Sequence, residues 1–348
     1  MSIAIFADKF SGTLSSNEVL DEIKKIFKYN NIKAAFFPVT DGGEGATEIF
    51  KQYGFKIEKA VMKKDFTGNW IPVEMLKIDK EIFFETSQLI GIENTNQNSL
   101  SLNTSCLSKI IDEADVLSMG GSRTNDAGIG LLSKLGIDFL VNNEIVEDPK
   151  PEDFQSISNV NITDNFQKIE KKVLVDTNIS LLGENNAFKI FGPQKGLEKK
   201  DIKFLEKNVE RIYQLLANKL SASFDLYKEG GGASGGLSFA LSEVLGCKII
   251  SGSDYFLEKT KIKNKIINYE NAVLAEGKFD FSSVNGKVLG EILKLHNGNK
   301  YFIGGKFNYK EKDIFEKIFT LGNKGLKNPK EELRNASYKL AHTLKMNR

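Results

Sequence analysis

The chain has 348 residues, of which 41% are hydrophobic and 27% charged, so it can bury a sizeable core and is neither a mini-protein nor a disordered polymer. Its 48 basic and 46 acidic side chains leave a formal charge of +2, which argues against nucleic acid or a membrane surface as the main partner. Two cysteines and two histidines predict reduced thiols and no structural zinc site. The start of the sequence lacks a basic leader and no apolar run reaches about 18 residues, so we expect a cytoplasmic protein.

The first elements alternate between strand and helix. An apolar run at residues 3–7 predicts a strand, and apolar residues at helical spacing between 19 and 27 predict a helix that begins with a capping box of Ser15 and Glu18. A second strand at 34–39 precedes the turn TDGGEG and a helix closed by Gly54. Two such strand–helix units imply a parallel sheet.

The middle of the chain has a different pattern. Residues 57–90 alternate between apolar and polar positions with turn clusters at 65–69 and 78–80, which is typical of antiparallel strands, and we expect a second domain to begin here. A strand at 114–119 leads into the turn GGSRTNDAG and a helix that ends near Gly136. The sequence FLVNNEIV then predicts a hairpin around Asn142 and Asn143.

The later chain returns to strand–helix alternation. A strand at 173–175 precedes Asp176, an amphipathic helix runs from 198 to 220, and the turn GGGASGG precedes a helix capped by Gly246. Strands at 272–275 and 301–303, a helix at 288–295 and a charged terminal helix complete the pattern. The fold class is therefore α/β.

Three glycine turns lie where we expect helices to begin, at 40–45, 120–128 and 230–236. The start of a helix presents unpaired amides that suit a phosphate, and glycine lets the ligand approach closely. For any single turn, a backbone with positive φ is an adequate explanation. Three turns at the carboxyl ends of parallel strands nevertheless favour a composite pocket for an anion.

Carboxylates gather at the same strand ends and turns. Hard oxygen ligands suit Mg²⁺, and phosphoryl transfer needs a base that orients a hydroxyl. The alternative is that Asp41, Glu44 and Asp126 are helix caps or first-turn charges. Asp176 is harder to explain that way, because no helix directly follows it, although an Asx turn remains open. The carboxylates in question are Asp8, Asp41, Glu44, Asp126, Asp176, Glu276 and Asp280.

Few cations are placed to meet a phosphate. Arg123 is one of four arginines and lies inside a glycine turn, although a solvated surface charge is an equally good interpretation. Lys9 and Lys195 neighbour turn residues and could neutralise phosphate oxygens, but an ordinary exposed lysine would explain either. The chain has no GxxxxGK[ST] element, no protein-kinase catalytic loop and no GxGxxG after a strand.

These motifs together resemble the bacterial glycerate kinase family of the first type, nearly from end to end. ADKFSGTLSS at 7–16 is similar to that family's APDKFKGSLSA, and PVTDGGEGATE at 38–48 to its P-x-ADGGEGT element. GGSRTNDAGIGLLSKLG at 120–136, FGPQKG at 191–196 and GGGASGGLSFAL at 230–241 match in order and approximate spacing. AEGKFDFSSVNGK at 275–287 matches GEGRLDxQTxxGK without a gap, which aligns Glu276, Asp280, Gly286 and Lys287 with the family's motif.

The resemblance implies a Mg²⁺-dependent kinase that uses ATP to phosphorylate D-glycerate, with 2-phosphoglycerate favoured over 3-phosphoglycerate as the product. It also implies two α/β domains with the active site in the cleft between them. One would be a parallel-sheet, three-layer domain like flavodoxin or a Rossmann fold, from residues 1–60 with 270–348, and the other a mixed domain inserted at 61–269. The partners would be a small hydroxy acid and a nucleotide, and we leave a homodimer open.

The motifs and the resemblance together predict four groups of site residues. The catalytic residues are Asp176 as the base, with Lys9 and Arg123. The nucleotide would contact Gly42, Gly43, Gly120, Gly121, Ser122, Thr124, Asn125, Asp126, Gly231, Gly232, Ser234 and Gly235. The substrate would contact Asp8, Ser11, Glu85 and Gln194. The metal would be held by some of Asp41, Glu44, Glu276 and Asp280.

Several positions depart from the family pattern. Ser11 replaces a lysine, Ser282 and Ser283 replace a Gln-Thr pair, and DTNISLLG keeps Asp176 but has Ile179 where an Asn-Pro pair is expected. The segment NTSCLSK carries Cys106 and Ser108 in place of glycines. These departures leave two alternatives open, a kinase for another small hydroxy acid or a non-catalytic sensor of such an acid.

Overall fold

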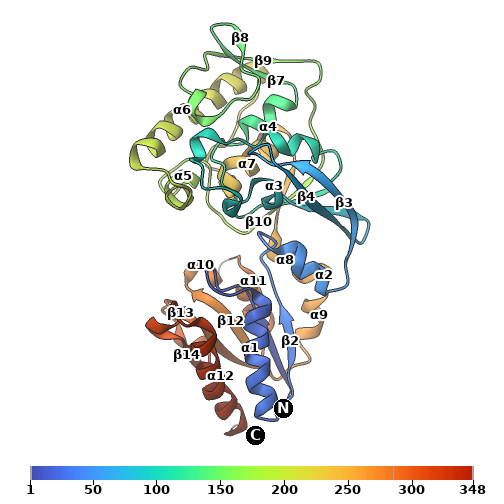
Figure 1. Ribbon diagram of the computed structural model, residues 1–348, viewed down its shortest axis with the longest axis vertical. Coiled ribbons are helices and arrows are strands. Elements are labelled where there is room, and N and C mark those ends of the chain that lie inside the picture. Colours follow the sequence, from blue (N-terminus) through green and yellow to red (C-terminus); the bar gives the residue numbers. More distant parts are fainter. Residues whose placement is uncertain (1, 285, 347–348) are drawn as a thin grey trace. The chain divides into compact units, whose positions relative to one another are not determined.

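The computed structural model describes residues 2–284 and 286–346, and the chain divides into two compact units (Figure 1). Unit 1 comprises Met1–Asp41 and Ser253–Arg348, and unit 2 comprises Gly42–Gly252. Unit 2 is thus one continuous segment between the two parts of unit 1. The borders fall at 41/42 and 252/253, whereas the sequence suggested borders near 60 and 270.

Unit 1 contains a parallel sheet in the order β14-β13-β12-β1-β2 among the described residues. All five residues of β1 are buried, so both faces of the sheet are covered. Helices α1 and α12 pack against each other over one face (Figure 1). The strands are β1 (Ile3–Ala7), β2 (Ala35–Pro38), β12 (Asn271–Phe279), β13 (Asn299–Phe307) and β14 (Lys317–Thr320). The helices are α1 (Ser16–Tyr29), α8 (Gly252–Lys259), α9 (Ile262–Ile266), α10 (Phe281–Val284), α11 (Val288–Leu295) and α12 (Pro329–Met346).

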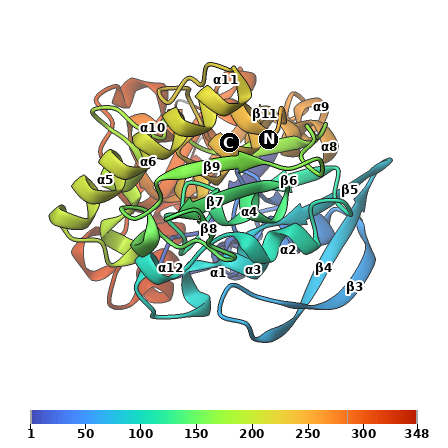
Figure 2. The same cartoon turned by 90° about the horizontal axis from the view of Figure 1, so that it is seen from above.

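Unit 2 contains a mixed sheet in the order β11-β10-β6-β5-β4-β3 within the described ranges. Strands β11, β10, β6 and β5 run parallel, and β4 and β3 continue the sheet in antiparallel fashion. Figure 2 shows β3 and β4 as a long hairpin at the edge of this unit. The six strands are β3 (Lys56–Lys64), β4 (Trp70–Ile78), β5 (Glu81–Glu85), β6 (Val116–Ser118), β10 (Lys172–Val175) and β11 (Lys248–Ser251).

A small antiparallel sheet in the order β8-β7-β9 and several helices complete unit 2. Its strands are β7 (Ile137–Val141), β8 (Glu144–Ile145) and β9 (Asn159–Ile162). Its helices are α2 (Ala46–Gln52), α3 (Ser87–Ile90), α4 (Ile129–Lys134), α5 (Ala187–Phe191), α6 (Lys199–Leu220) and α7 (Leu237–Phe239). The predicted α/β class, with one parallel and one mixed part, is confirmed.

Several local predictions are confirmed. Ser15 caps α1, its Oγ accepting from Glu18 N while a Glu18 carboxylate oxygen accepts from Ser15 N. Asn142 and Asn143 both have positive φ, at 52° and 68°, in the β7–β8 hairpin. The antiparallel strands after residue 56, which were expected near the start of a second domain, lie in unit 2, where the pairing of β5 with β6 joins them to its main sheet. Within the described ranges, no helix has the length and apolarity needed to cross a membrane.

Candidate functional site

The parallel sheet of unit 1 carries three carboxylates where adjacent strands end. Asp8 directly follows β1, Asp41 lies three residues after β2, and Glu276 belongs to β12. Strands β12, β1 and β2 are neighbours, and Asp8 N donates to the Ala275 carbonyl at 2.9 Å, next to Glu276. The carboxyl ends of parallel strands share one edge of a sheet, so three acidic side chains predicted separately from the sequence come together here.

Burial, with some mutual repulsion, raises the pKa of these three carboxylates. Burial is the largest cause of the raised pKa of Asp8, and the charges of Asp41 and Glu276 add to it. Burial likewise raises the pKa of Asp41 and of Glu276, and Lys287 opposes both shifts. Glu276 Oε2 is buried and has no hydrogen-bond partner among the described residues. Such a cluster favours a cation or a donor that relieves its repulsion.

Two residues that were not predicted as site residues hold this cluster. Lys287 Nζ lies 3.2 Å from Glu276 Oε1, and the neighbouring carboxylates raise the pKa of the lysine. Asp41 Oδ1 accepts from Val288 N at 2.6 Å, at the start of α11, and from the buried Ser253 Oγ at 3.2 Å. The family resemblance aligned Lys287, but no local pattern marked Ser253, because its contact spans 212 residues of chain.

The remaining predicted residues of unit 1 are placed differently. Asp280 is engaged by Lys278 Nζ at 2.7 Å and by Ser282 N at 2.9 Å, and these contacts lower its pKa to about 2. Ser11 is exposed in a turn. Lys9 acts on the carboxylates through its charge, which lowers the pKa of Asp41. Within residues 2–284 and 286–346 no group of three or more His, Cys, Asp or Glu side chains is arranged to hold a metal ion.

Unit 2 brings the glycine turns and Asp176 together. Asp176 follows β10 and Gly120 lies two residues after β6, and these two strands pair in parallel. A Cβ atom built on Gly43 would lie 3.6 Å from Asp176 Oδ2 and 3.8 Å from Gly120 Cα, which are ordinary contact distances, so the three segments lie against one another. A Cβ atom built on Gly120 would lie only 2.9 Å from Gly43 Cα, so this close approach requires glycine at position 120. The segments around Gly43, Gly120 and Asp176 therefore converge at one edge of the sheet. The turn at 230–236 joins them through hydrogen bonds to the turn at 120–128 and to the segment after Asp176.

Those contacts connect the turns at 120–128 and 230–236. Gly120 N donates to Ser234 Oγ at 3.1 Å, and Ala127 N donates to the Gly235 carbonyl at 3.0 Å. Gly232 N donates to the Ile179 carbonyl at 2.8 Å, three residues beyond Asp176. The side chain of Glu44 also lies against the turn, since a Cβ on Gly121 would come within 2.8 Å of its Oε2.

The predicted reason for phosphate binding at these turns is wrong in one respect. The helices that follow two of them are short, with seven residues in α2 and six in α4, and their first amides are already taken by buried carboxylates. Glu85 accepts from Gly45 N at 2.7 Å and from Thr47 N at 2.9 Å. Asp126 accepts from Gly128 N at 3.3 Å and from Gly130 N at 3.0 Å. Protein carboxylates thus occupy the positions expected for a ligand's phosphate.

Asp126 and Glu85 consequently act as caps within the fold. Asp126 also accepts from Thr104 N at 2.9 Å and Thr104 Oγ1 at 2.7 Å, and burial raises its pKa although these bonds oppose the rise. The Ser87 hydroxyl donates to Glu85 at 2.6 Å. The partner residue Thr104 was not predicted, because it precedes Asp126 by 22 residues and belongs to a segment that departs from the family pattern.

The turn at 120–128 carries two hydroxyl side chains, those of Ser122 and Thr124. Thr124 Oγ1 is fully buried and has no hydrogen-bond partner within the described part of the chain. Ser122 Oγ lies 3.1 Å from Lys195 Nζ. Lys195 is itself only 3% exposed, so its interpretation as an ordinary exposed lysine is wrong.

The other predicted residues of unit 2 have structural partners or lie at the surface. Arg123 Nε donates to the Gln97 carbonyl at 3.1 Å, which fixes the direction of the guanidinium. Asn125 Nδ2 donates to Ser99 Oγ at 3.0 Å. Gln194 is exposed, whereas Gly231 lies inside the 230–236 turn with its amide donating to the Lys228 carbonyl at 3.1 Å. The Gly42 carbonyl accepts a hydrogen bond from Ser118 Oγ in β6.

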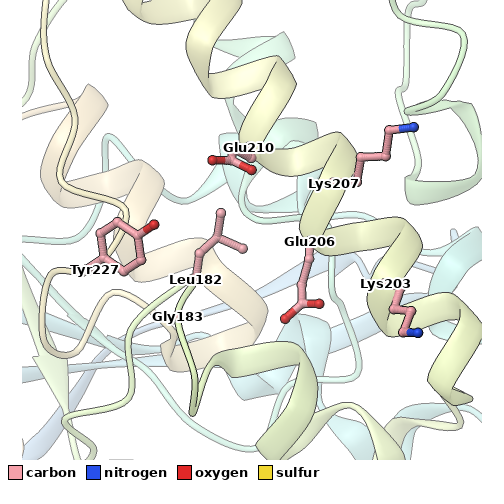
Figure 3. A pocket seen from close by; sticks show the side chains of 7 residues that line it. All are labelled: Leu182, Gly183, Lys203, Glu206, Lys207, Glu210 and Tyr227. Carbon is pink, nitrogen blue, oxygen red and sulfur yellow. The ribbon is translucent and has the colours of Figure 1, made fainter.

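Two surface pockets, one in each unit, contain none of the predicted site residues. The pocket of unit 2 has a volume of about 340 Å³ and lies along α6. In Figure 3 the Glu210 side chain lies on the side of α6 toward Tyr227, while the amino groups of Lys203 and Lys207 point away from Tyr227. The pocket of unit 1, about 360 Å³, includes Leu293, Lys300 and Asp313. The chemistry of the strand ends is therefore separate from these cavities.

Comparison with known proteins identifies relatives along the whole chain. The model of the glycerate kinase family matches residues 3–345. Glycerate kinase from Bacillus cereus is 26% identical over 344 residues, covering 91% of this chain and 88% of that protein. Glycerate 2-kinase from Escherichia coli is 25% identical over 305 residues, covering 83% and 80%. In both cases the match covers most of the length of the relative.

A solved structure has the same fold. The crystal structure of a putative glycerate kinase 2 from Salmonella typhimurium LT2 superposes with a TM-score of 0.72 and covers 100% of this chain and 99% of that one, at 24% identity. The predicted two-part α/β architecture and the assignment to an ATP-dependent kinase family are confirmed. The family model matches 343 of the 348 residues, so the chain belongs to the glycerate kinase family.

Proposed function

We propose that this protein transfers the γ-phosphoryl group of ATP to D-glycerate and releases 2-phosphoglycerate. The proposal depends above all on the convergence of Gly43, Gly120 and Asp176 at the carboxyl ends of β6 and β10. Ligands of parallel sheets bind at this edge, and phosphoryl transfer is achieved mainly by positioning and electrostatic stabilisation. The Escherichia coli relative, named as a glycerate 2-kinase, supports both the acceptor and the site of phosphorylation.

Each group in unit 2 has a definite role in this proposal. Asp176 accepts the proton of the attacking glycerate hydroxyl. The hydroxyls of Ser122 and Thr124 donate to phosphate oxygens of ATP, which would satisfy the buried Thr124 Oγ1. Arg123, oriented by the Gln97 carbonyl, balances the negative charge of the substrate carboxylate or of the transferred group.

The carboxylates of unit 1 suit a magnesium ion. Mg²⁺ commonly takes one or two protein carboxylates and completes its shell with water and phosphate oxygens, so it needs no preformed cage of three ligands. Asp8, Asp41 and Glu276 offer oxygen ligands of the right kind, and the unpartnered Glu276 Oε2 is one of them. When bound, the ion neutralises phosphate charge. Asp280 suits this role less, because Lys278 and Ser282 already engage it.

Purified protein with ATP, MgCl₂ and D-glycerate tests the function directly. We expect ADP release that requires all three components, and a product that enolase alone converts to phosphoenolpyruvate. A product that enolase accepts only after phosphoglycerate mutase is added would be 3-phosphoglycerate and would refute the regiochemistry. Turnover of another hydroxy acid with little turnover of D-glycerate would reassign the acceptor. Thermal stabilisation by the acid without ADP release would indicate a sensor.

Replacement of Asp176 tests the proposed base. We expect Asp176→Ala to lower kcat by about 10² to 10⁴-fold, which is the usual contribution of general base catalysis. Its melting temperature should change little, because Asp176 is half-buried and outside the core. Asp164→Ala, at an exposed aspartate of the same unit, is the matched control and should keep wild-type kcat. A wild-type rate for Asp176→Ala would exclude the assigned role.

A further inference from the structure

The Lys195 ammonium is built into the turn at residues 120–128. Its Nζ lies 2.9 Å from the Thr124 carbonyl oxygen, 3.1 Å from Ser122 Oγ and 3.5 Å from Asn125 Oδ1. An ammonium has three N–H donors and no acceptor, so the turn provides one partner for each donor. All three partners are neutral groups of one short segment. The lysine is therefore saturated by the turn and has no donor left for a ligand.

Stability alone does not explain a lysine at this position. Its removal from water lowers the pKa of Lys195 to about 7, with Asp126 opposing the shift and Arg123 adding to it. An apolar side chain of the same length would fill the space without the cost of burying a charge. The position of the charge must therefore contribute to something besides packing.

The Lys195 ammonium fixes the orientation of the hydroxyl groups in the turn. Because Ser122 Oγ accepts a hydrogen bond from Lys195, the hydrogen of that hydroxyl must be donated to another group. The Thr124 carbonyl is fixed by the same ammonium, which sets the backbone from which the unpartnered Thr124 Oγ1 projects. Lys195 thus leaves two oriented hydroxyl donors, at Ser122 and Thr124, for a ligand that accepts hydrogen bonds.

We propose that Lys195 is the positioning residue of the nucleotide-binding turn, and that it acts on ATP through Ser122 and Thr124 without touching the phosphates. This inference rests on the proposed function, because it takes the ligand of these hydroxyls to be the ATP phosphates. It assigns to unit 2 a cation whose role is to hold the turn in the form that binds ATP. Loss of the ammonium should therefore weaken ATP binding more than it alters the chemical step.

Lys195→Met tests the proposal, because methionine keeps much of the length and removes the charge. We expect KM for ATP to rise about 10- to 100-fold at pH 6.5, the usual effect of losing hydrogen bonds from a charged group, while kcat falls by less than KM rises. Lys199→Met, at an exposed lysine that begins α6, is the matched control and should keep the wild-type KM. A wild-type KM for ATP in Lys195→Met would overturn the proposal, as would a fall in kcat alone.

Hydrogen exchange provides a readout that does not depend on turnover. In the ligand-free protein, Lys195→Met should speed amide exchange across residues 120–128 at least several-fold and leave α12 unchanged. If the wild-type protein released no ADP, the proposed function would fail, but this measurement would still test the role of Lys195 in the turn. Unchanged exchange at 120–128 would show that the ammonium does not hold the turn.

A measurement on the wild-type protein covers the case in which Lys195→Met does not fold. If the ammonium orients the turn, KM for ATP should rise as the pH increases from 6 to 9, as Lys195 loses its proton. The charged groups that act on Lys195 are Asp126, which raises its pKa, and Arg123, which lowers it. A KM for ATP that stays constant up to pH 9 would contradict the proposal.

Discussion

Asp126 shows how a single buried carboxylate can shape a glycine turn. Its two oxygens accept four hydrogen bonds, from Thr104 N, Thr104 Oγ1, Gly128 N and Gly130 N. Removing it would leave these donors buried without an acceptor. The residue therefore ties the segment around Thr104 to the turn at 120–128 and to the start of α4.

We expect Asp126→Ala to lower the free energy of unfolding by about 3 kcal/mol or more, because a buried network would lose its common acceptor. Urea denaturation would measure the change. Asp164→Ala, at an exposed aspartate, should stay within about 0.5 kcal/mol of wild type. Equal stabilities for Asp126→Ala and the wild-type protein would mean that the network does not form in solution.

The lowered pKa of Lys195 predicts a specific dependence of stability on pH. Its folded pKa is about 7, below the usual 10.5, so between these values the unfolded chain binds a proton that the folded chain does not. Stability attributable to Lys195 should therefore rise with pH across that window, by up to about 1.4 kcal/mol per pH unit, and be lowest below pH 7. The check is the difference in unfolding free energy between wild type and Lys195→Met at pH 6 and pH 9. Relative to Lys195→Met, the wild-type protein should have a higher unfolding free energy at pH 9 than at pH 6.

The positions of the candidate site residues could be predicted where a strand end marked them, and their contacts could not be predicted where these involve a distant partner. Asp8 and Asp176 follow apolar strands, and both lie at the ends of β1 and β10. Glu85 and Asp126 were predicted as ligand contacts but accept from backbone amides, and the amide of Thr47 lies 38 residues from Glu85. Hydrogen bonds over such separations leave no periodic trace in a sequence.

At the scale of elements, α1 depends on its capping box. Ser15 Oγ lies 3.3 Å from Glu18 N, and Ser15 N lies 3.0 Å from Glu18 Oε2, so two otherwise unpaired amides are satisfied. Because α1 packs against α12 in the core of unit 1, fraying at its start would loosen that pair.

Ser15→Ala should destabilise the protein by about 1 kcal/mol through loss of the cap. Urea denaturation measures the loss, and hydrogen exchange should rise first in the opening turn of α1. Ser11→Ala, in the exposed turn just before, is the control and should change stability by less than about 0.5 kcal/mol. Equal losses at the two serines would argue that the cap contributes nothing.

Elements with a strong local pattern were predictable, and their partners were not. The periodicity of α6 and the Asn142–Asn143 turn depend on neighbouring residues, and both are present. Whether β5 pairs with β6 depends on residues about 30 positions apart, and this pairing decides that the antiparallel strands belong to the main sheet of unit 2. The first helix after each glycine turn was predicted, but not that α2 and α4 would be so short.

At the scale of the whole molecule, unit 2 is an insertion whose ends meet. A Cβ atom on Gly42 would lie 3.0 Å from Gly252 Cα, and in unit 1 Ser253 Oγ lies 3.2 Å from Asp41 Oδ1. Each unit has a hydrophobic cluster of its own. A continuous segment with its own core and adjacent ends meets the usual requirements of an independent domain.

We expect the fragment 42–252 to fold by itself, with a cooperative urea transition and the near-ultraviolet circular dichroism of a packed core. Unit 1 with residues 41 and 253 joined by a short glycine linker should also fold, since the side chains of Asp41 and Ser253 lie within hydrogen-bond distance of each other. A fragment 42–252 that unfolds without cooperativity would mean that unit 2 needs the rest of the chain.

The carboxylates that cap α2 and α4 have a practical consequence for work with this enzyme. Sulfate or inorganic phosphate in a buffer meets two helix starts that the protein has already neutralised from within, by Glu85 and Asp126. Common buffer anions should consequently leave these two positions alone, and crystals grown from sulfate salts should show none bound there.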